Sequence, residues 1–223
     1  MHPGINGPKL KDKPALIMAG SGDVITHQEL NELSNQGAQL FRSLGLKPGD
    51  SMAFMMENHK LFFPIAFAAW RSGLKYTAIS WRLQANEVEY IVKDCGAKVF
   101  ITSKFLEDSA KDLASSLKGV HKFMLDGESG DFKSFEEAIK QMPVEPIEDE
   151  CQGAAMLYSS GTTGKPKGVS REINLSPLPY DSADDDLGLT RVVQGLYSAN
   201  EESIYLSPAP LYHSAPMGFN TGF

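Results

Sequence analysis

Apolar and polar positions recur along this chain with two periods, and the two periods predict strands and helices in turn. Short apolar runs predict buried strands at residues 15–19, 51–56, 76–79, 98–102 and 121–125. Between these runs, apolar residues recur every three or four positions, as in helices with one buried face. The helices are predicted to begin near Thr26, Asn58, Asn86, Ser103 and Ser134. Repeated strand–helix–strand units predict the α/β class, with parallel sheet layers covered by helices.

Two of the predicted helix starts carry a capping box, in which a hydroxyl residue and a glutamate three positions later cap each other's backbone amides. Thr26 pairs with Glu29 in the first box, and Ser134 pairs with Glu137 in the second. The stretch 143–150 that follows the last of these helices is rich in proline and acidic residues. That composition predicts a linker.

A loop that combines glycines, hydroxyls and lysines follows Tyr158. Residues 158–169 read YSSGTTGKPKGV, and the apolar run 154–158 before them predicts a strand that leads into the loop. Glycine lets backbone amides approach a ligand closely, serine and threonine add hydroxyl donors, and lysine adds a positive charge. Ligands of parallel sheets bind beyond the carboxyl ends of the strands. The sequence therefore predicts a polyphosphate-binding loop at that edge.

Two common motifs are excluded for this loop. A Walker A loop needs a second glycine that is followed by lysine and a hydroxyl residue. Counted from Gly161, Pro166 stands where that glycine belongs, and Lys165 is followed by proline. The Gly-x-Ser-x-Gly turn of serine hydrolases is also absent. The remaining alternative to a phosphate loop is a plain Gly/Ser/Thr linker between domains.

Composition and charge limit the classes of partner that the protein could bind. The hydrophobic fraction of 42% and the charged fraction of 22% are ordinary for a globular protein. The formal net charge of -7 argues against a nucleic acid partner, which needs a basic surface. Residues 1–14 lack the apolar core of a signal peptide, and the apolar run 61–70 is too short to span a bilayer. We therefore expect a cytoplasmic protein without an integral membrane segment.

The positions of the cysteines and histidines do not indicate a metal-binding site. Cys95 and Cys151 stand outside any metal-binding spacing, so we expect two buried thiols in a reducing compartment. The histidines are scattered, and no HxxxH or HExxH pattern is present, which argues against a zinc site. The acidic run 182–186 is expected to be a solvated surface segment.

The YSSGTTGKPKGV stretch resembles the phosphate loop of the adenylate-forming superfamily, which comprises acyl- and aryl-CoA synthetases, luciferases and peptide-synthetase adenylation domains. Further segments that resemble this family are 25–30, 45–50, 57–58, 86–99 and 208–213. Residues 80–82 and 170–174 depart from the family pattern, and a proline-rich, acidic insertion follows the second of them. The resemblance covers only the first part of these enzymes, whose adenine and ribose segments and C-terminal lysine have no counterpart here.

The resemblance therefore implies that residues 1–223 are the N-terminal part of an acyl-CoA synthetase-like adenylation domain. It implies an α/β subdomain at about 48–170 that carries the phosphate loop, and the start of the next subdomain at 203–223. The C-terminal domain would be absent. We therefore expect the chain to be inactive by itself, because much of the ATP site is missing.

The resemblance also implies an activity. The full enzyme would use ATP to convert a fatty or aryl carboxylic acid to acyl-AMP and then, with coenzyme A, to acyl-CoA. Mg²⁺ would accompany ATP. Two alternatives stay open: another adenylating enzyme, either carrier-protein-loading or luciferase-like, and a non-catalytic nucleotide-binding module. The sequence does not identify the acid.

Site residues follow from the same resemblance. The ATP phosphates are expected to contact Ser159, Ser160, Gly161, Thr162, Thr163, Gly164, Lys165 and Lys167. Thr163 is the first choice for a hydroxyl near Mg²⁺, and Lys167 matches the family's catalytic cation better than Lys165 does. His213 is the third expected catalytic residue. Tyr212 and His213 are expected beside the acyl carboxylate or the thiol path, with packing in the core as the alternative.

Overall fold

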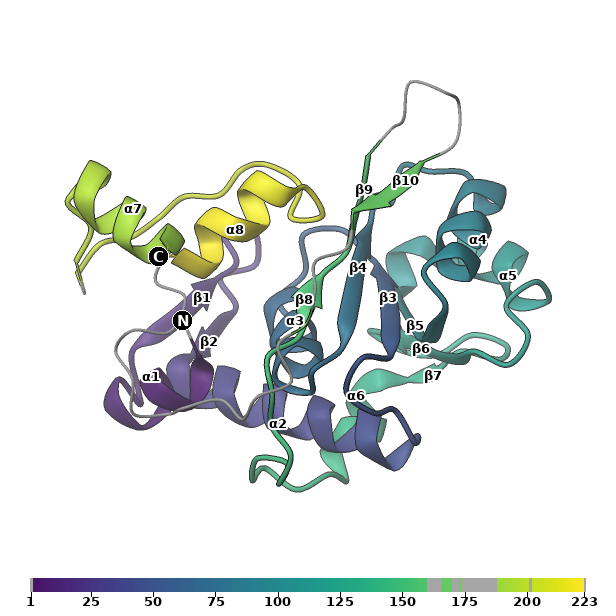
Figure 1. The fold of residues 1–223 in the computed structure, drawn as a ribbon, viewed down its shortest axis with the longest axis horizontal. Helices are drawn as coiled ribbons and strands as arrows, with labels where there is room; N and C mark the ends of the chain where they lie inside the picture. The colour runs from purple at the N-terminus through teal and green to yellow at the C-terminus, as the bar shows by residue number, and fades with distance from the viewer. Residues whose placement is uncertain (1, 160–165, 170–172, 174–187, 201, 223) are drawn as a thin grey trace.

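A sheet of six parallel strands, in the order β7–β6–β5–β3–β4–β8, forms the centre of the molecule (Figure 1). The computed structural model describes residues 2–159, 166–169, 173, 188–200 and 202–222. The strands are β3 (Ser51–Met55), β4 (Lys75–Ile79), β5 (Ala97–Ser103), β6 (His121–Leu125), β7 (Lys133–Ser134) and β8 (Ala154–Ala155). The predicted α/β class with a parallel sheet is confirmed.

Helices cover both faces of this sheet (Figure 1). One face is covered by α2 (His27–Ser43), α3 (Phe62–Arg71) and α6 (Phe135–Lys140). The other is covered by α4 (Ala85–Asp94), α5 (Glu107–Ala114) and the 3₁₀ turn η1 (Lys104–Leu106). In β3, Met52 and Phe54 join the first apolar core, while Ala53 and Met55 join the second. A strand buried on both faces is typical of a parallel sheet between helical layers.

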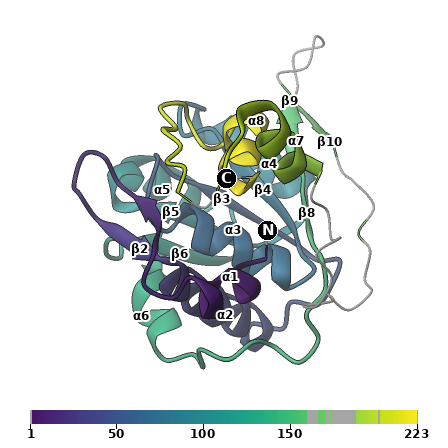
Figure 2. The ribbon, with the colours of Figure 1, turned by 90° about the vertical axis from the view of Figure 1, so that its left-hand side faces the viewer.

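Smaller elements lie around the sheet. The helix α1 (Pro3–Lys9) and the antiparallel strands β1 (Pro14–Ile17) and β2 (Val24–Thr26) precede it, and β9 (Leu157–Ser159), β10 (Lys167–Val169), α7 (Gly188–Tyr197) and α8 (Ser214–Gly222) follow it. Figure 2 shows α7 and α8 together at one end of the molecule, opposite the end formed by α1, α2 and α6. None of the helices in the described ranges is long and apolar enough to cross a membrane.

The capping box of α2 forms as predicted. The Thr26 hydroxyl accepts from the Glu29 amide at 3.2 Å, and the Glu29 carboxylate accepts from the Thr26 amide at 2.8 Å. At the start of α6 the Ser134 hydroxyl accepts from the Glu137 amide at 3.2 Å, so one of the two bonds of the second predicted box is confirmed. Gly45 then ends the segment after α2 with a φ of 82°, a left-handed conformation that favours glycine.

Three predicted helices form, but they differ from the prediction in their exact start or in their capping bond. The N-cap of α3 is Leu61, because the Asn58 side chain bonds to a distant segment. The N-cap of α4 is Gln84, which forms a capping box with Glu87, so Asn86 lies inside the helix. Ser103 is the N-cap residue of η1, as predicted, but it makes no side-chain capping bond, because its hydroxyl donates to the carboxylate of Glu57.

The predicted linker 143–150 ends in a buried ion pair. Glu150 pairs with Arg71, whose side chain is 1% exposed and also donates to the Ser34 hydroxyl at 2.7 Å. His2 lies 3.7 Å from Glu150 and stacks obliquely on Trp70. Before this pair the linker runs along α2, where Asn35 and Gln39 donate to the carbonyls of Val144 and Glu145.

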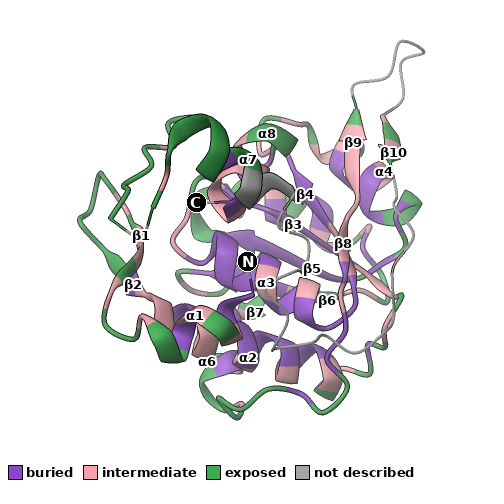
Figure 3. Ribbon diagram, turned by 60° about the vertical axis from the view of Figure 1, so that its left-hand side comes forward, coloured by how far each residue is buried: buried purple, intermediate pink, exposed green. Residues whose placement is uncertain are grey.

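Burial separates the sheet from its surroundings (Figure 3). The central strands and α3 are mostly buried, whereas α7 is mostly exposed where the structure describes it. Cys95 and Cys151 are both buried free thiols, as predicted, and burial raises the pKa of each. The acidic run 182–186 lies outside the described residues.

Candidate active site

The chain leaves the main sheet at β8 and continues into a hairpin (Figure 1). β8 pairs in parallel with β4, and the amide of Met156 donates to the Tyr76 carbonyl at 2.9 Å. β9 then pairs with β10 in antiparallel fashion. The sequence predicted the strand that enters the loop, at the carboxyl end of the sheet. It did not predict the return strand.

Gly153 fixes the root of this hairpin, because the backbone there lies against Leu74, which directly precedes β4. A Cβ at this position would lie 2.3 Å from the Leu74 carbonyl oxygen and 2.8 Å from the Leu74 nitrogen. The Gly153 amide donates to the Trp70 carbonyl at 2.6 Å, and the Ala154 amide donates to the Leu74 carbonyl at 3.0 Å. Only glycine allows this approach without moving the backbone.

Lys167 and Ser159 are the two predicted phosphate-binding residues that the structure describes. They lie directly opposite each other in the β9–β10 pair, and both are exposed. Residues directly opposite in an antiparallel pair point to the same face, with Cβ atoms about 4.5–5.5 Å apart. The hairpin thus brings a cation and a hydroxyl together at the base of the loop. The other predicted loop residues lie outside the described part of the chain: Ser160, Gly161, Thr162, Thr163, Gly164 and Lys165.

Tyr212 and His213 lie on a separate segment whose backbone is hydrogen-bonded to the side chain of Asn58. Asn58 donates to the Ala209 carbonyl at 3.1 Å and accepts from the Leu211 amide at 3.0 Å. Tyr212 is buried in the first apolar core, as in the alternative interpretation of the sequence. His213 is exposed directly before α8, with its ring centroid 4.5 Å from that of Tyr212.

The strand order reverses between β3 and β5, because the chain passes from β3 to β4 on one side and then to β5 on the other. Such a reversal is a frequent ligand position in open α/β sheets. Here Ser103, at the end of β5, donates to the Glu57 carboxylate at 2.5 Å. The Ser103 hydroxyl and the Glu57 carboxylate therefore already have each other as hydrogen-bond partners at this reversal point. Sequence reasoning missed this pair, since Glu57 follows β3 and Ser103 ends β5, 46 residues away in sequence.

Glu57, His59 and Asp126 form a cluster whose ligand atoms lie within 4.8 Å of one another. The hydrogen bonds assign the histidine tautomer. His59 Nδ1 accepts from the Leu61 amide at 3.1 Å, so the proton is on Nε2, which lies 3.1 Å from Asp126 Oδ2. An Nε2 that carries a proton has no lone pair for a metal ion. We therefore assign this cluster to hydrogen bonding.

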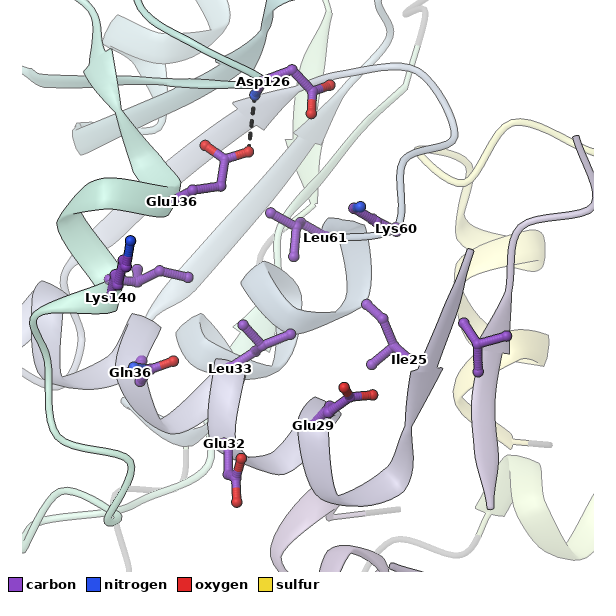
Figure 4. A pocket seen from close by; sticks show the side chains of 12 residues that line it. Ile25, Glu29, Glu32, Leu33, Gln36, Lys60, Leu61, Asp126, Glu136 and Lys140 are labelled. Carbon is purple, nitrogen blue, oxygen red and sulfur yellow. Dashed lines mark hydrogen bonds between the residues drawn. The ribbon is translucent and has the colours of Figure 1, made fainter. Parts of the chain in front are cut away.

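A groove of about 560 Å³ opens between α2, α6 and β2 (Figure 4). Ile25, Leu33 and Leu61 contribute apolar side chains to its lining. Two lining carboxylates already accept backbone amides: Glu29 accepts from Thr26, and Glu136 accepts from Asp126 at 2.9 Å. None of the predicted site residues that the structure describes lines this groove.

Residues 6–222 match the family model for AMP-binding enzymes. The chain belongs to the AMP-binding enzyme family. This confirms the resemblance to the adenylate-forming superfamily that the loop motif carries. The match extends over nearly the whole sequence and so includes both the hairpin and the 208–213 segment.

Curated relatives within this family include ligases for different acids. A fatty acid–[acyl-carrier-protein] ligase, ScoC of Streptomyces coeruleorubidus, is 29% identical over 70% of this chain and 29% of its own length. A feruloyl-CoA synthase of an Amycolatopsis species is 25% identical over 92% of this chain and 38% of its own length. The chain therefore spans well under half the length of these relatives.

A solved structure supports the fold. A protein assigned as a long-chain-fatty-acid CoA ligase from Rhodopseudomonas palustris superposes with a TM-score of 0.82 at 19% identity. The superposition covers 99% of this chain and 53% of that one. At this identity, the likeness establishes the arrangement of helices and strands.

Proposed function

We propose that the protein carrying this chain activates a carboxylic acid with ATP. A carboxylate oxygen attacks the α-phosphorus of ATP, and the bond from that phosphorus to the bridging oxygen breaks. The products are acyl-AMP and pyrophosphate. The thiol of coenzyme A then attacks the acyl carbon and loses its proton, a C–S bond forms, the bond from the acyl carbon to the bridging oxygen breaks, and AMP leaves with that former carboxylate oxygen.

The cross-strand pair of Ser159 and Lys167 is the observation that carries this proposal. Negative charge grows on pyrophosphate as it leaves, so donors that are fixed near it favour the transition state over the ground state. A paired hairpin fixes a hydroxyl and an ammonium group before the nucleotide arrives. The hairpin also follows a strand of the parallel sheet, at the edge where such sheets bind ligands.

The remaining loop residues would surround the phosphates. We assign backbone amides of Gly161 and Gly164 and the hydroxyls of Ser160, Thr162 and Thr163 to the β- and γ-phosphates. The loop offers oxygen donors and no thiolate or imidazole, and Mg²⁺ prefers oxygen ligands. Thr163 would hold Mg²⁺, which neutralises phosphate charge when bound. In this scheme His213 lies on the path of the acid or the thiol.

The acyl acceptor is proposed to be coenzyme A. Feruloyl-CoA synthase supports this choice, whereas ScoC is named as a ligase of acyl carrier protein. The two acceptors differ at a step that follows adenylate formation. A carrier-loading enzyme would therefore release pyrophosphate with ATP and acid, and it would form no acyl-CoA.

The test measures pyrophosphate release by the longest natural polypeptide that carries this chain. ATP, Mg²⁺ and a panel of fatty and aryl acids are supplied, with and without coenzyme A. We expect acid-dependent pyrophosphate release, and acyl-CoA only when coenzyme A is present. The 223-residue chain by itself should show no turnover. Failure of the longer protein to bind ATP would refute the proposal, and turnover by the short chain would refute the predicted need for further segments.

A further inference from the structure

We propose that Asp94, the last residue of α4, is a positioning residue that holds the phosphate loop through Tyr158. The Tyr158 hydroxyl donates to the Asp94 carboxylate at 2.5 Å. This bond connects the hairpin to a helix on the second face of the sheet, 64 residues away in sequence. The expected effect on the rate of adenylate formation rests on the proposed function, whereas the hydrogen bond between Tyr158 and Asp94 does not.

The hairpin needs such a connection. β9 and β10 pair over only Leu157–Ser159 and Lys167–Val169, and β8, which joins them to the sheet, is Ala154–Ala155. A two-stranded ribbon of this length has little stability of its own. Its angle to the sheet is therefore set by what its side chains contact.

Tyr158 contacts both the partner strand and the helical layer. It lies opposite Gly168, where a Cβ would come within 2.9 Å of Tyr158 Cζ and 2.5 Å of Met156 Cε. The aromatic ring therefore occupies the space that a side chain on β10 would take. On its other side, the ring packs with Met156 against the core beneath α4. One side chain thus links both strands of the hairpin to the sheet.

The position of Asp94 is unfavourable for the helix that carries it. A carboxylate in the last turn of a helix faces the negative end of the helix dipole. Asp94 is also exposed, so it contributes nothing to the apolar core. The hydrogen bond from the Tyr158 hydroxyl offsets the unfavourable interaction of the Asp94 carboxylate with the helix dipole. Burial and the Asp94 carboxylate together raise the pKa of Tyr158, so the hydroxyl stays protonated and remains a donor.

The consequence falls on the two described phosphate-loop residues. Ser159 follows Tyr158 directly, and Lys167 precedes Gly168 directly. A tilt of the hairpin would therefore move both donors relative to the phosphates. Misplacement of a catalytic group by about 1 Å can lower a rate by about 100-fold.

The test uses Asp94→Ala, Tyr158→Phe and the double variant of the longest natural polypeptide. Hydrogen exchange is measured on peptides that cover residues 154–169, without nucleotide. The single-turnover rate constant of adenylate formation is measured in parallel, because it does not depend on the fraction of folded protein. Asp108→Ala, which removes an exposed carboxylate on α5, is the matched control.

We expect faster hairpin exchange and a rate constant about 10- to 100-fold lower in either single variant. The double variant should show the same exchange and the same rate constant as the single variants, because each substitution removes the same hydrogen bond. Asp94→Asn keeps an oxygen acceptor and should be intermediate, and Asp108→Ala should match the wild type. Wild-type exchange in both single variants, or additive rate losses, would overturn the proposal. A wild type that forms no adenylate would refute the proposed function, while the exchange measurement would still test the tether.

Discussion

Lys167 lies directly opposite Ser159 across the β9–β10 pair, so the two ends of the glycine-rich loop are held together by backbone pairing. The pairing also places Ser159 and Lys167 on the same face of the hairpin. The relative position of the hydroxyl and the ammonium group is therefore set by the backbone of β9 and β10.

Lys167→Ala should lower kcat/KM for ATP in the longest natural polypeptide. A hydrogen bond from an ammonium group to phosphate contributes about 1.5–3 kcal/mol, so the loss should be about 10- to 150-fold. Steady-state pyrophosphate release measures it. Lys133→Ala, at an exposed position in β7 on the opposite edge of the sheet, is the control and should be neutral. Equal effects of the two substitutions would remove Lys167 from the site.

Thr163→Ala should slow adenylate formation more than it weakens ATP binding. A donor aimed at charge that develops during the reaction is worth about 2.7–4 kcal/mol, and one hydroxyl among several should be near the lower value. The rate constant comes from single-turnover kinetics, and the ATP affinity comes from calorimetry. Thr163→Ser keeps the hydroxyl and should restore most of the rate. Equal losses in rate and affinity would instead indicate ground-state binding alone.

Asn58→Ala should loosen the segment that carries Tyr212 and His213. It removes two hydrogen bonds to backbone groups, and each contributes about 0.5–1.5 kcal/mol. Urea unfolding should therefore show a loss of about 1–3 kcal/mol. Asn58→Asp can still accept from the Leu211 amide but cannot donate to the Ala209 carbonyl, so its loss of unfolding free energy should lie between zero and that of Asn58→Ala.

The control for Asn58 is another exposed asparagine, Asn86 on α4. Asn86→Ala should change the free energy of unfolding by less than about 0.5 kcal/mol. Hydrogen exchange at the Leu211 amide should be faster in Asn58→Ala than in either the wild type or Asn86→Ala. An unchanged exchange rate would show that other contacts hold the segment.

Local signals were sufficient for the strands β3, β4, β5, β6 and β8 of the main sheet, but not for the two-residue strand β7. The apolar run at β3 and the capping box of α2 are both encoded within a few consecutive residues, and both formed where predicted. The loop motif was sufficient for the family, because its glycines, hydroxyls and lysines occur together in one stretch. Periodicity and short motifs are therefore reliable where neighbouring residues determine the structure.

The missed elements depend on distant contacts. Helix α1 has the sequence PGINGPK, in which prolines and glycines oppose helix formation. It forms against α2, where Gly7 allows close approach to Asn31: a Cβ on Gly7 would lie 2.8 Å from that of Asn31. The bond from Leu211 to Asn58 joins residues 153 positions apart. No pattern along the sequence predicts such a pair.

The buried histidine at the start of α1 should make the stability of the protein depend on pH. Burial, and secondarily the Arg71 charge, lower the pKa of His2 from 6.5 to about 3. The unfolded chain therefore binds a proton at His2 below pH 6.5, whereas the folded protein does not until about pH 3. The contribution of His2 to stability is complete above pH 6.5 and is lost as pH falls from there toward 3. At pH 5 the loss should be about 2 kcal/mol, at about 1.36 kcal/mol per pH unit.

Urea unfolding at pH 7.5 and pH 5 measures this loss, and two variants isolate it. His2→Asn supplies an amide oxygen that can accept from the Gly4 amide in place of Nδ1, and His2→Phe keeps a ring against Trp70. Neither side chain titrates, so each variant should lose about 2 kcal/mol less than the wild type between the two pH values. Burial raises the pKa of Glu150 in the folded state, and this contribution, which favours folding at low pH, is retained in every variant. If both variants kept the wild-type pH dependence, His2 would have to titrate normally in the folded protein.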